Sequence, residues 1–101
     1  MPLIYKNDIG DILRFETQLD GTKIDPSQTK IIVKKPSGTI AEWTPDQIED
    51  DGTVIYITKQ NDLDESGPYR IQVKVYLTDG TGPFYTDATT IVVYDRPTID
   101  Y

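Results

Sequence analysis

The residues from Tyr69 to Leu77 constrain the fold more than any other stretch of this chain. Along them, apolar or aromatic side chains alternate with mostly polar ones without a break. Successive side chains of a strand point to opposite faces of a sheet, so strict alternation indicates a strand with one buried face. The predicted buried face carries Tyr69, Ile71, Val73, Val75 and Leu77, and the exposed face carries Arg70, Gln72, Lys74 and Tyr76.

The turn before this strand, Glu65-Ser66-Gly67-Pro68, leads directly into Tyr69. This pattern resembles the tyrosine corner of immunoglobulin-like sandwiches, where a tight turn of this kind opens strand F. Ile71 then stands where an antibody domain has its second cysteine. The resemblance implies that Gly67 and Tyr69 anchor the fold, and that the Tyr69 hydroxyl bonds to backbone between Asp62 and Glu65.

Shorter alternating stretches, separated by turn residues, predict further strands. Leu13, Phe15 and Thr17 share one face at 11–17, and Ile12 lies on the other face or marks a bulge. Ile31 and Val33 share one face at 29–35. Pro36-Ser37-Gly38 predicts a hairpin turn into a strand at 39–44, and the position of Trp43 on that returning strand predicts that it is buried between the sheets.

Three regions are less clearly patterned. In 53–58, either Val54 and Tyr56 or Ile55 and Ile57 can face inward, and we favour Ile55 and Ile57. Residues 45–51 are predicted to form one helical turn or a loop. A short edge strand is predicted at 3–5, and one continuous last strand at 84–94. The whole pattern predicts an all-β, immunoglobulin-like antiparallel β-sandwich of about seven strands. It spans residues 1–96, and residues 97–101 form a C-terminal tail.

The charge balance limits the kinds of partner that this chain is expected to bind. With 17 acidic and 10 basic residues, the formal net charge is −7. Nucleic acids and anionic membranes attract clustered Lys and Arg, so neither is an expected partner. No apolar run approaches the length of about 20 residues that crosses a bilayer. The first residues lack the pattern of a signal peptide, so we expect synthesis in the cytoplasm of the host cell.

The residue types that the chain contains also limit the catalytic and metal-binding chemistry that we expect of it. The chain contains no histidine and no cysteine, which removes the commonest general base and the thiolate ligands of zinc. The acidic run Glu49-Asp50-Asp51 lacks the regular ligand spacing of an EF-hand loop. We therefore expect no catalytic residues, no cofactor and no metal site, and we interpret the chain as something other than an enzyme.

Tyrosine is the residue type that points to binding, since the chain has 7 of them. Tyrosine is enriched at protein interfaces because its ring is apolar and its hydroxyl is polar, although it is also an ordinary strand residue. The predicted interface residues are Tyr5, Tyr76, Ile99 and Tyr101. Ile99 and Tyr101 follow Pro97, which restricts the backbone before them, so we expect this tail to insert into a neighbouring subunit.

Three segments together resemble a known family. They are Ile4-Tyr5-Lys6-Asn7-Asp8-Ile9-Gly10, then Val33-Lys34-Lys35-Pro36-Ser37-Gly38-Thr39 with Glu42-Trp43-Thr44, and Asp62-Leu63-Asp64-Glu65-Ser66-Gly67-Pro68-Tyr69. They look like the immunoglobulin-like domain that opens phage baseplate upper proteins, and like small stand-alone phage virion proteins. The resemblance implies a structural subunit or adaptor of a tailed-phage virion, at the tail, baseplate, neck or head surface. Its partners would be other virion proteins, in many copies. The alternative is a carbohydrate-binding surface module, with Trp43 and Tyr76 or Tyr85 as exposed aromatics.

Overall fold

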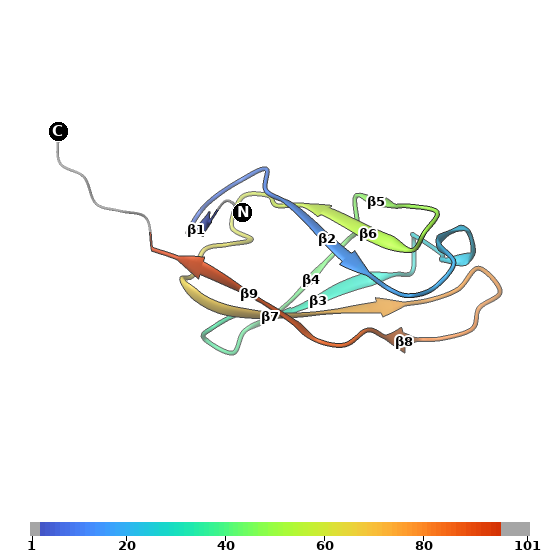
Figure 1. Ribbon diagram of the computed structural model, residues 1–101. Coiled ribbons are helices and arrows are strands. Elements are labelled where there is room, and N and C mark those ends of the chain that lie inside the picture. The colour runs from blue at the N-terminus through green and yellow to red at the C-terminus, as the bar shows by residue number, and fades with distance from the viewer. Residues whose placement is uncertain (1–2, 96–101) are drawn as a thin grey trace, which may run out of the picture.

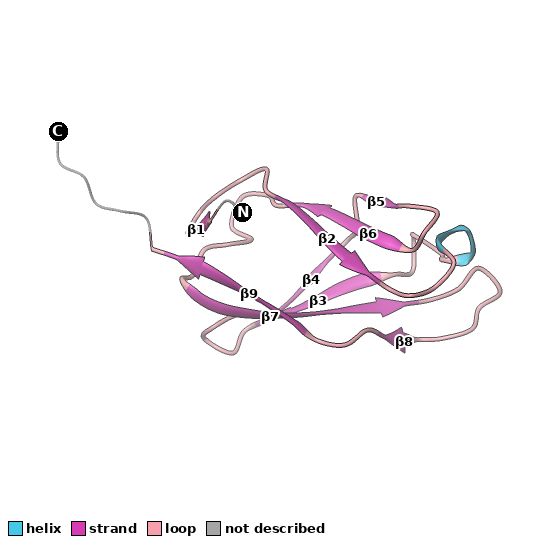
Figure 2. Ribbon diagram, viewed as in Figure 1, coloured by secondary structure: helices cyan, strands magenta, loops and turns pink. Residues whose placement is uncertain are grey.

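Residues 3–95 are described by a computed structural model, in which two β-sheets pack face to face (Figure 1). Within these residues, Figure 2 shows strands joined by loops and one short 3-10 turn, η1 (Gly21–Lys23). The larger sheet contains β1 (Ile4–Tyr5), β3 (Lys30–Lys34), β4 (Ile40–Trp43), β7 (Gly67–Val75), β8 (Phe84–Tyr85) and β9 (Thr89–Tyr94). The smaller sheet contains β2 (Ile12–Glu16), β5 (Gln47–Ile48) and β6 (Thr53–Ile57).

The order of the strands is that of an immunoglobulin-like sandwich. In such folds strands B, E and D lie in one sheet, and strands C, F and G lie in the other. Here the smaller sheet has the order β2-β6-β5, and the larger sheet has the order β1-β9-β7-β3-β4 with β8 also beside β7. The predicted sandwich is therefore confirmed. One pairing departs from the antiparallel prediction, because β1 runs parallel to β9.

The strict alternation of β2, β3 and β7 is confirmed by the side chains that these strands bury. Strand β7 lies between β3 and β9, with Ile71 opposite Val33 of β3 and opposite Thr89 of β9. Ile12 lies on the outer face of β2 and is exposed, which decides between the two readings of that residue. The core between the sheets consists of Leu13, Phe15, Ile24, Ile31, Val33, Trp43, Val54, Tyr56, Leu63, Tyr69, Ile71, Val73, Val75 and Val93.

The prediction for β6 is wrong. Val54 and Tyr56 belong to the core, whereas Ile57 is exposed and Ile55 packs outside the core cluster. Every residue from Val54 to Ile57 is apolar or aromatic, so alternation alone cannot choose the inner face. The choice follows from Tyr56, whose ring stacks on Trp43 with centroids 4.6 Å apart. Its hydroxyl donates a hydrogen bond to Oδ2 of Asp62, and burial together with this bond raises the pKa of Tyr56.

Two other predictions need correction. Residues 45–51 contain the two-residue strand β5, which pairs with β6, in place of a helical turn or loop. The predicted last strand is divided into β8 and β9, both of which pair with β7. The break is at Thr86, whose backbone N–H donates to the Val73 carbonyl (3.0 Å) and whose hydroxyl accepts from the Val73 N–H (2.9 Å). A side chain therefore completes the ladder where the strand is interrupted.

The tyrosine corner is present. Tyr69 is completely buried, and its hydroxyl donates to the Glu65 carbonyl (2.8 Å) and accepts from the Glu65 N–H (2.9 Å). Gly67 has a φ of 119°, a conformation that side chains rarely adopt, and a Cβ there would lie 3.1 Å from the ring of Pro36. Gly67 and Tyr69 therefore hold the turn that enters β7 against the β3–β4 hairpin.

The exposed turns are built around aspartates. In each, the carboxylate accepts hydrogen bonds from the residue two positions on, the Asx-turn geometry that favours this residue in turns. These bonds, from hydroxyl and N–H groups, lower the pKa of each carboxyl below its usual value of 3.8. The pairs are Asp20 with Thr22, Asp25 with Ser27, Asp51 with Thr53, and Asp79 with Thr81.

Candidate functional site

One long side of the sandwich is open, because within residues 3–95 β2 has a neighbouring strand on one edge only. Its partner β6 occupies the inner edge. Ile55 and Ile57 of β6 use their backbone groups toward β5: the Asp46 N–H donates to the Ile55 carbonyl (2.9 Å), and the Ile57 N–H donates to the Asp46 carboxylate (2.8 Å). Backbone groups alternate in direction along an antiparallel ladder. Consequently Ile12 and Arg14, which face Ile57 and Ile55, direct their own N–H and carbonyl groups outward.

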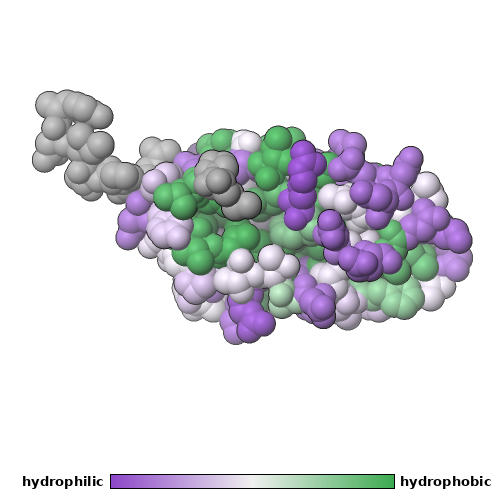
Figure 3. Space-filling view, in the orientation of Figure 1, coloured by the Kyte–Doolittle hydropathy of each residue, from purple (hydrophilic) through white to green (hydrophobic). Residues whose placement is uncertain are grey.

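An apolar groove runs along the first half of this edge. It has a volume of about 590 Å³. In Figure 3, hydrophobic surface gathers in this part of the molecule, between β1 and the start of β2. The groove lies between the two sheets, so apolar side chains from both sheets line it. Its lining residues are Ile4, Gly10, Asp11, Ile12, Leu13, Arg14 and Ile91.

A second groove of about 510 Å³ continues along the rest of the edge. Arg14 lines both grooves, and Phe15 and Ile71 form part of the wall of the second one. Because these two side chains belong to the core, the groove reaches down to the packed interior. Its rim is polar and includes Glu16, Tyr85 and Asp87. The open side therefore offers free backbone groups on β2 with an apolar section and a polar section beside them.

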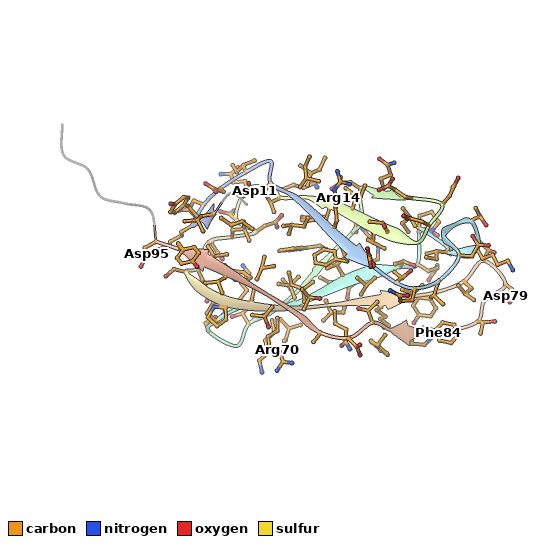
Figure 4. All side chains as sticks on the ribbon, viewed as in Figure 1. Asp11, Arg14, Arg70, Asp79, Phe84 and Asp95 are labelled. Atoms are coloured by element: carbon orange, nitrogen blue, oxygen red, sulfur yellow. The ribbon has the colours of Figure 1, made fainter. Side chains whose placement is uncertain are left out.

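Two charged side chains mark this side. Arg14 points away from the core on the outer face of β2 (Figure 4), and its guanidinium lies 3.6 Å from the Glu49 carboxylate. Both partners are largely exposed, so this ion pair contributes little and can rearrange. Asp11 lines the apolar groove, and its Oδ2 is buried without a hydrogen bond from residues 3–95. Burial and the nearby Asp8 carboxylate raise the pKa of Asp11.

Tyr5 and Tyr76, the two predicted interface residues that the structure describes, lie in different parts of the fold. Tyr5 is half-buried on β1, with its ring centroid 6.4 Å from that of Tyr94 at the end of β9. Tyr76 follows the opposite end of β7, and the Lys74 ammonium lies 5.7 Å from its ring centroid. Ile99 and Tyr101 lie outside the described residues. The open side was not among the predicted sites, although Ile12, an apolar residue on the otherwise polar face of its strand, was a signal for it.

Trp43 cannot stack on a sugar. It is only 5% exposed and lies flat against Tyr56, with an angle of 11° between the rings. Tyr85 is exposed, but its neighbour across the ladder is Lys74, so it has no aromatic partner in register. The exposed aromatic platform that the carbohydrate-binding interpretation requires therefore lacks its tryptophan.

Two other kinds of site are absent from residues 3–95. These residues contain no group of three or more His, Cys, Asp or Glu side chains placed to hold a metal ion. Over the same residues, no helix has the length and apolar character that a membrane span requires.

Comparison with known proteins adds no relative. No family model matches the chain, and neither a curated protein nor a solved structure is found to match it.

Proposed function

We propose that this chain is a structural docking module, a subunit or adaptor of a tailed-phage virion that acts through protein–protein contact. One observation carries the docking part of the proposal, namely the open side of the sandwich with the unpaired edge of β2. An edge strand presents free N–H and carbonyl groups that another chain can extend. The apolar groove beside it adds the hydrophobic area that makes such a contact specific.

The exposed apolar side chains near this edge support the same role. Leu3, Ile9 and Ile12 are each more than half exposed, and all three come from the first twelve residues of the chain. Single exposed apolar residues are common on soluble proteins, but three from one short segment beside an apolar groove favour a covered surface. The virion part of the proposal rests on the resemblance of three sequence segments to phage baseplate and virion proteins.

The proposal has two separate tests. Particles of the phage that encodes the chain should contain it as a stoichiometric component when purified and analysed by mass spectrometry. If the chain is absent from purified particles, the virion assignment is wrong.

The second test addresses the edge. Arg14→Pro removes an N–H that points away from β6, so the fold should survive while the edge is blocked. Glu42→Pro is the matched control. Glu42 lies on β4, which is an edge strand of the larger sheet, whereas β2 is an edge strand of the smaller sheet. Its N–H also points outward, since the Lys35 N–H bonds to the Thr39 carbonyl and the ladder alternates from there. We expect Arg14→Pro, but not Glu42→Pro, to reduce incorporation. Equal incorporation of both variants would exclude β2 as the docking edge.

A further inference from the structure

The charges on β2 are self-complementary, because Arg14 of one copy can lie opposite Glu16 of a second copy in an antiparallel pair. Residues whose backbone groups point outward are Ile12 and Arg14, and by the same alternation Glu16. Two copies of β2 can therefore join antiparallel only in registers that place these residues opposite one another. Five such registers exist, with the two-fold axis beside Ile12, Leu13, Arg14, Phe15 or Glu16.

Charge and the number of paired residues decide among the five registers. An axis at Ile12 pairs only Ile12 with its own copy, because Gly10, which would lie opposite Arg14, donates its N–H to the Thr58 carbonyl (2.8 Å). An axis at Arg14 places Arg14 opposite its own copy, and an axis at Glu16 does the same for Glu16. Like charges directly opposite each other destabilise a sheet. An axis at Leu13 places Arg14 opposite Ile12. Only an axis at Phe15 places Arg14 opposite Glu16 of the second copy, twice, by symmetry.

We propose that two copies of this chain pair antiparallel through β2, with Phe15 on the two-fold axis and Arg14 opposite Glu16 of the second copy. This inference rests on the proposed docking function and names the partner of the same edge. Two hydrogen-bonded residue pairs form at the centre of the contact, and each exchanges two backbone hydrogen bonds. The smaller sheets of the two copies then form one continuous sheet.

The side chains involved are free to make these contacts. The Arg14 side chain is 59% exposed, and its only ion pair within residues 3–95 is the 3.6 Å contact with Glu49. Glu16 is exposed and takes part in no ion pair within residues 3–95. Ile12, which is 57% exposed, comes to lie opposite Gln18 of the second copy and loses part of its contact with water. Leu13 and Phe15, which line the grooves, meet the inner face of the added strand.

The contact is narrow, so the dimer should be weak. A strand edge and its flanking grooves bury less surface than a standard protein–protein interface. The net charge of −7 on each copy adds repulsion, which physiological salt screens. The association should therefore be measured at physiological ionic strength, from micromolar to near-millimolar concentration.

The test is sedimentation velocity on the full chain, with charge variants that remain folded by circular dichroism. The wild type should dimerise with increasing concentration. Arg14→Glu places two carboxylates opposite each other across the contact, and Glu16→Arg places two guanidinium groups opposite each other. Each variant alone should therefore dimerise at least about tenfold more weakly. An equimolar mixture of the two variants pairs only opposite charges, and it should restore a heterodimer. Glu42→Arg, on the edge of β4, is the control and should behave as the wild type.

The outcomes separate this inference from the proposed function. A wild type that stays monomeric over the whole range, or a dimer that neither variant weakens, overturns the pairing through β2. A mixture that fails to associate overturns the Phe15 register. If the chain is monomeric and still enters particles in a manner that Arg14→Pro abolishes, the docking function stands and the partner is a different protein.

Discussion

Removing the Tyr69 hydroxyl tests the central element of the fold. Tyr69→Phe keeps the buried ring and deletes one atom that makes two hydrogen bonds, at 2.8 Å and 2.9 Å, to the backbone of Glu65. A net hydrogen bond contributes about 1 kcal/mol, and a partner left unsatisfied in a partly buried site costs more. We therefore expect Tyr69→Phe to lower the free energy of unfolding by about 2 kcal/mol or somewhat more, from a total of about 5–15 kcal/mol.

The assay is thermal and urea unfolding followed by circular dichroism. For a domain of this size, a loss of about 2 kcal/mol corresponds to a decrease in Tm of about 8–16 °C. Tyr94→Phe is the matched control, because Tyr94 is 45% exposed and its hydroxyl makes no hydrogen bond within residues 3–95. If Tyr69→Phe melts within a degree or two of the control, the corner does not stabilise the turn and the reasoning is wrong.

Four further predictions concern the stability of the isolated chain. Trp43→Ala should lower the free energy of unfolding by about 3–5 kcal/mol because the indole is buried. The tryptophan emission of the native wild type should be blue-shifted, and emission like that of tryptophan in water would contradict this. Lys34→Glu should raise the Tm by a few degrees, because Lys34 lies directly opposite Arg70 on the exposed face and the change replaces repulsion with attraction. The four turn aspartates have a lowered pKa, so the stabilisation that their carboxylates provide is present above pH 3.8 and is lost as the pH falls below that value. The Tm should therefore be the same at pH 7 and pH 5, and it should be lower at pH 3 and lower again at pH 2. Melts with chelator and with millimolar calcium should coincide, because the acidic residues lack a regular ligand spacing, and a large shift would revive a metal site.

The strands with one polar face were predictable because a single physical constraint determines them. In β2, β3 and β7 all the charged residues lie on one face, so only one orientation buries the apolar set without burying a charge. The tyrosine corner was predictable for a related reason, since Gly67 and Tyr69 act within five residues of Glu65. Local patterns suffice where the interactions that decide the structure are local.

Strand β6 shows where local patterns no longer suffice. Val54 and Ile55 are both buried, Val54 in the core and Ile55 outside the core cluster, so burial and apolar character do not distinguish the two faces of β6. The inner face depends on the contact between Tyr56 and Trp43, which come from different sheets. The break between β8 and β9 likewise depends on a bond from Thr86 to Val73, thirteen residues earlier in the chain. Neither partner can be identified from the spacing of apolar residues.

The open side depends on a choice of partner that alternation does not encode. The short strand β1 could in principle lie beside β2 or beside β9, since two residues form few bonds in either place. It lies parallel to β9, where the Lys6 N–H donates to the Tyr94 carbonyl (2.8 Å) and the Asn7 N–H to the Leu63 carbonyl (2.7 Å). These bonds after β1 extend its pairing and direct the chain across the end of the sandwich. Strand β2 is left with a free edge as a result, and a groove remains between the sheets at that edge. The surface that we propose for docking thus follows from the position of the first strand.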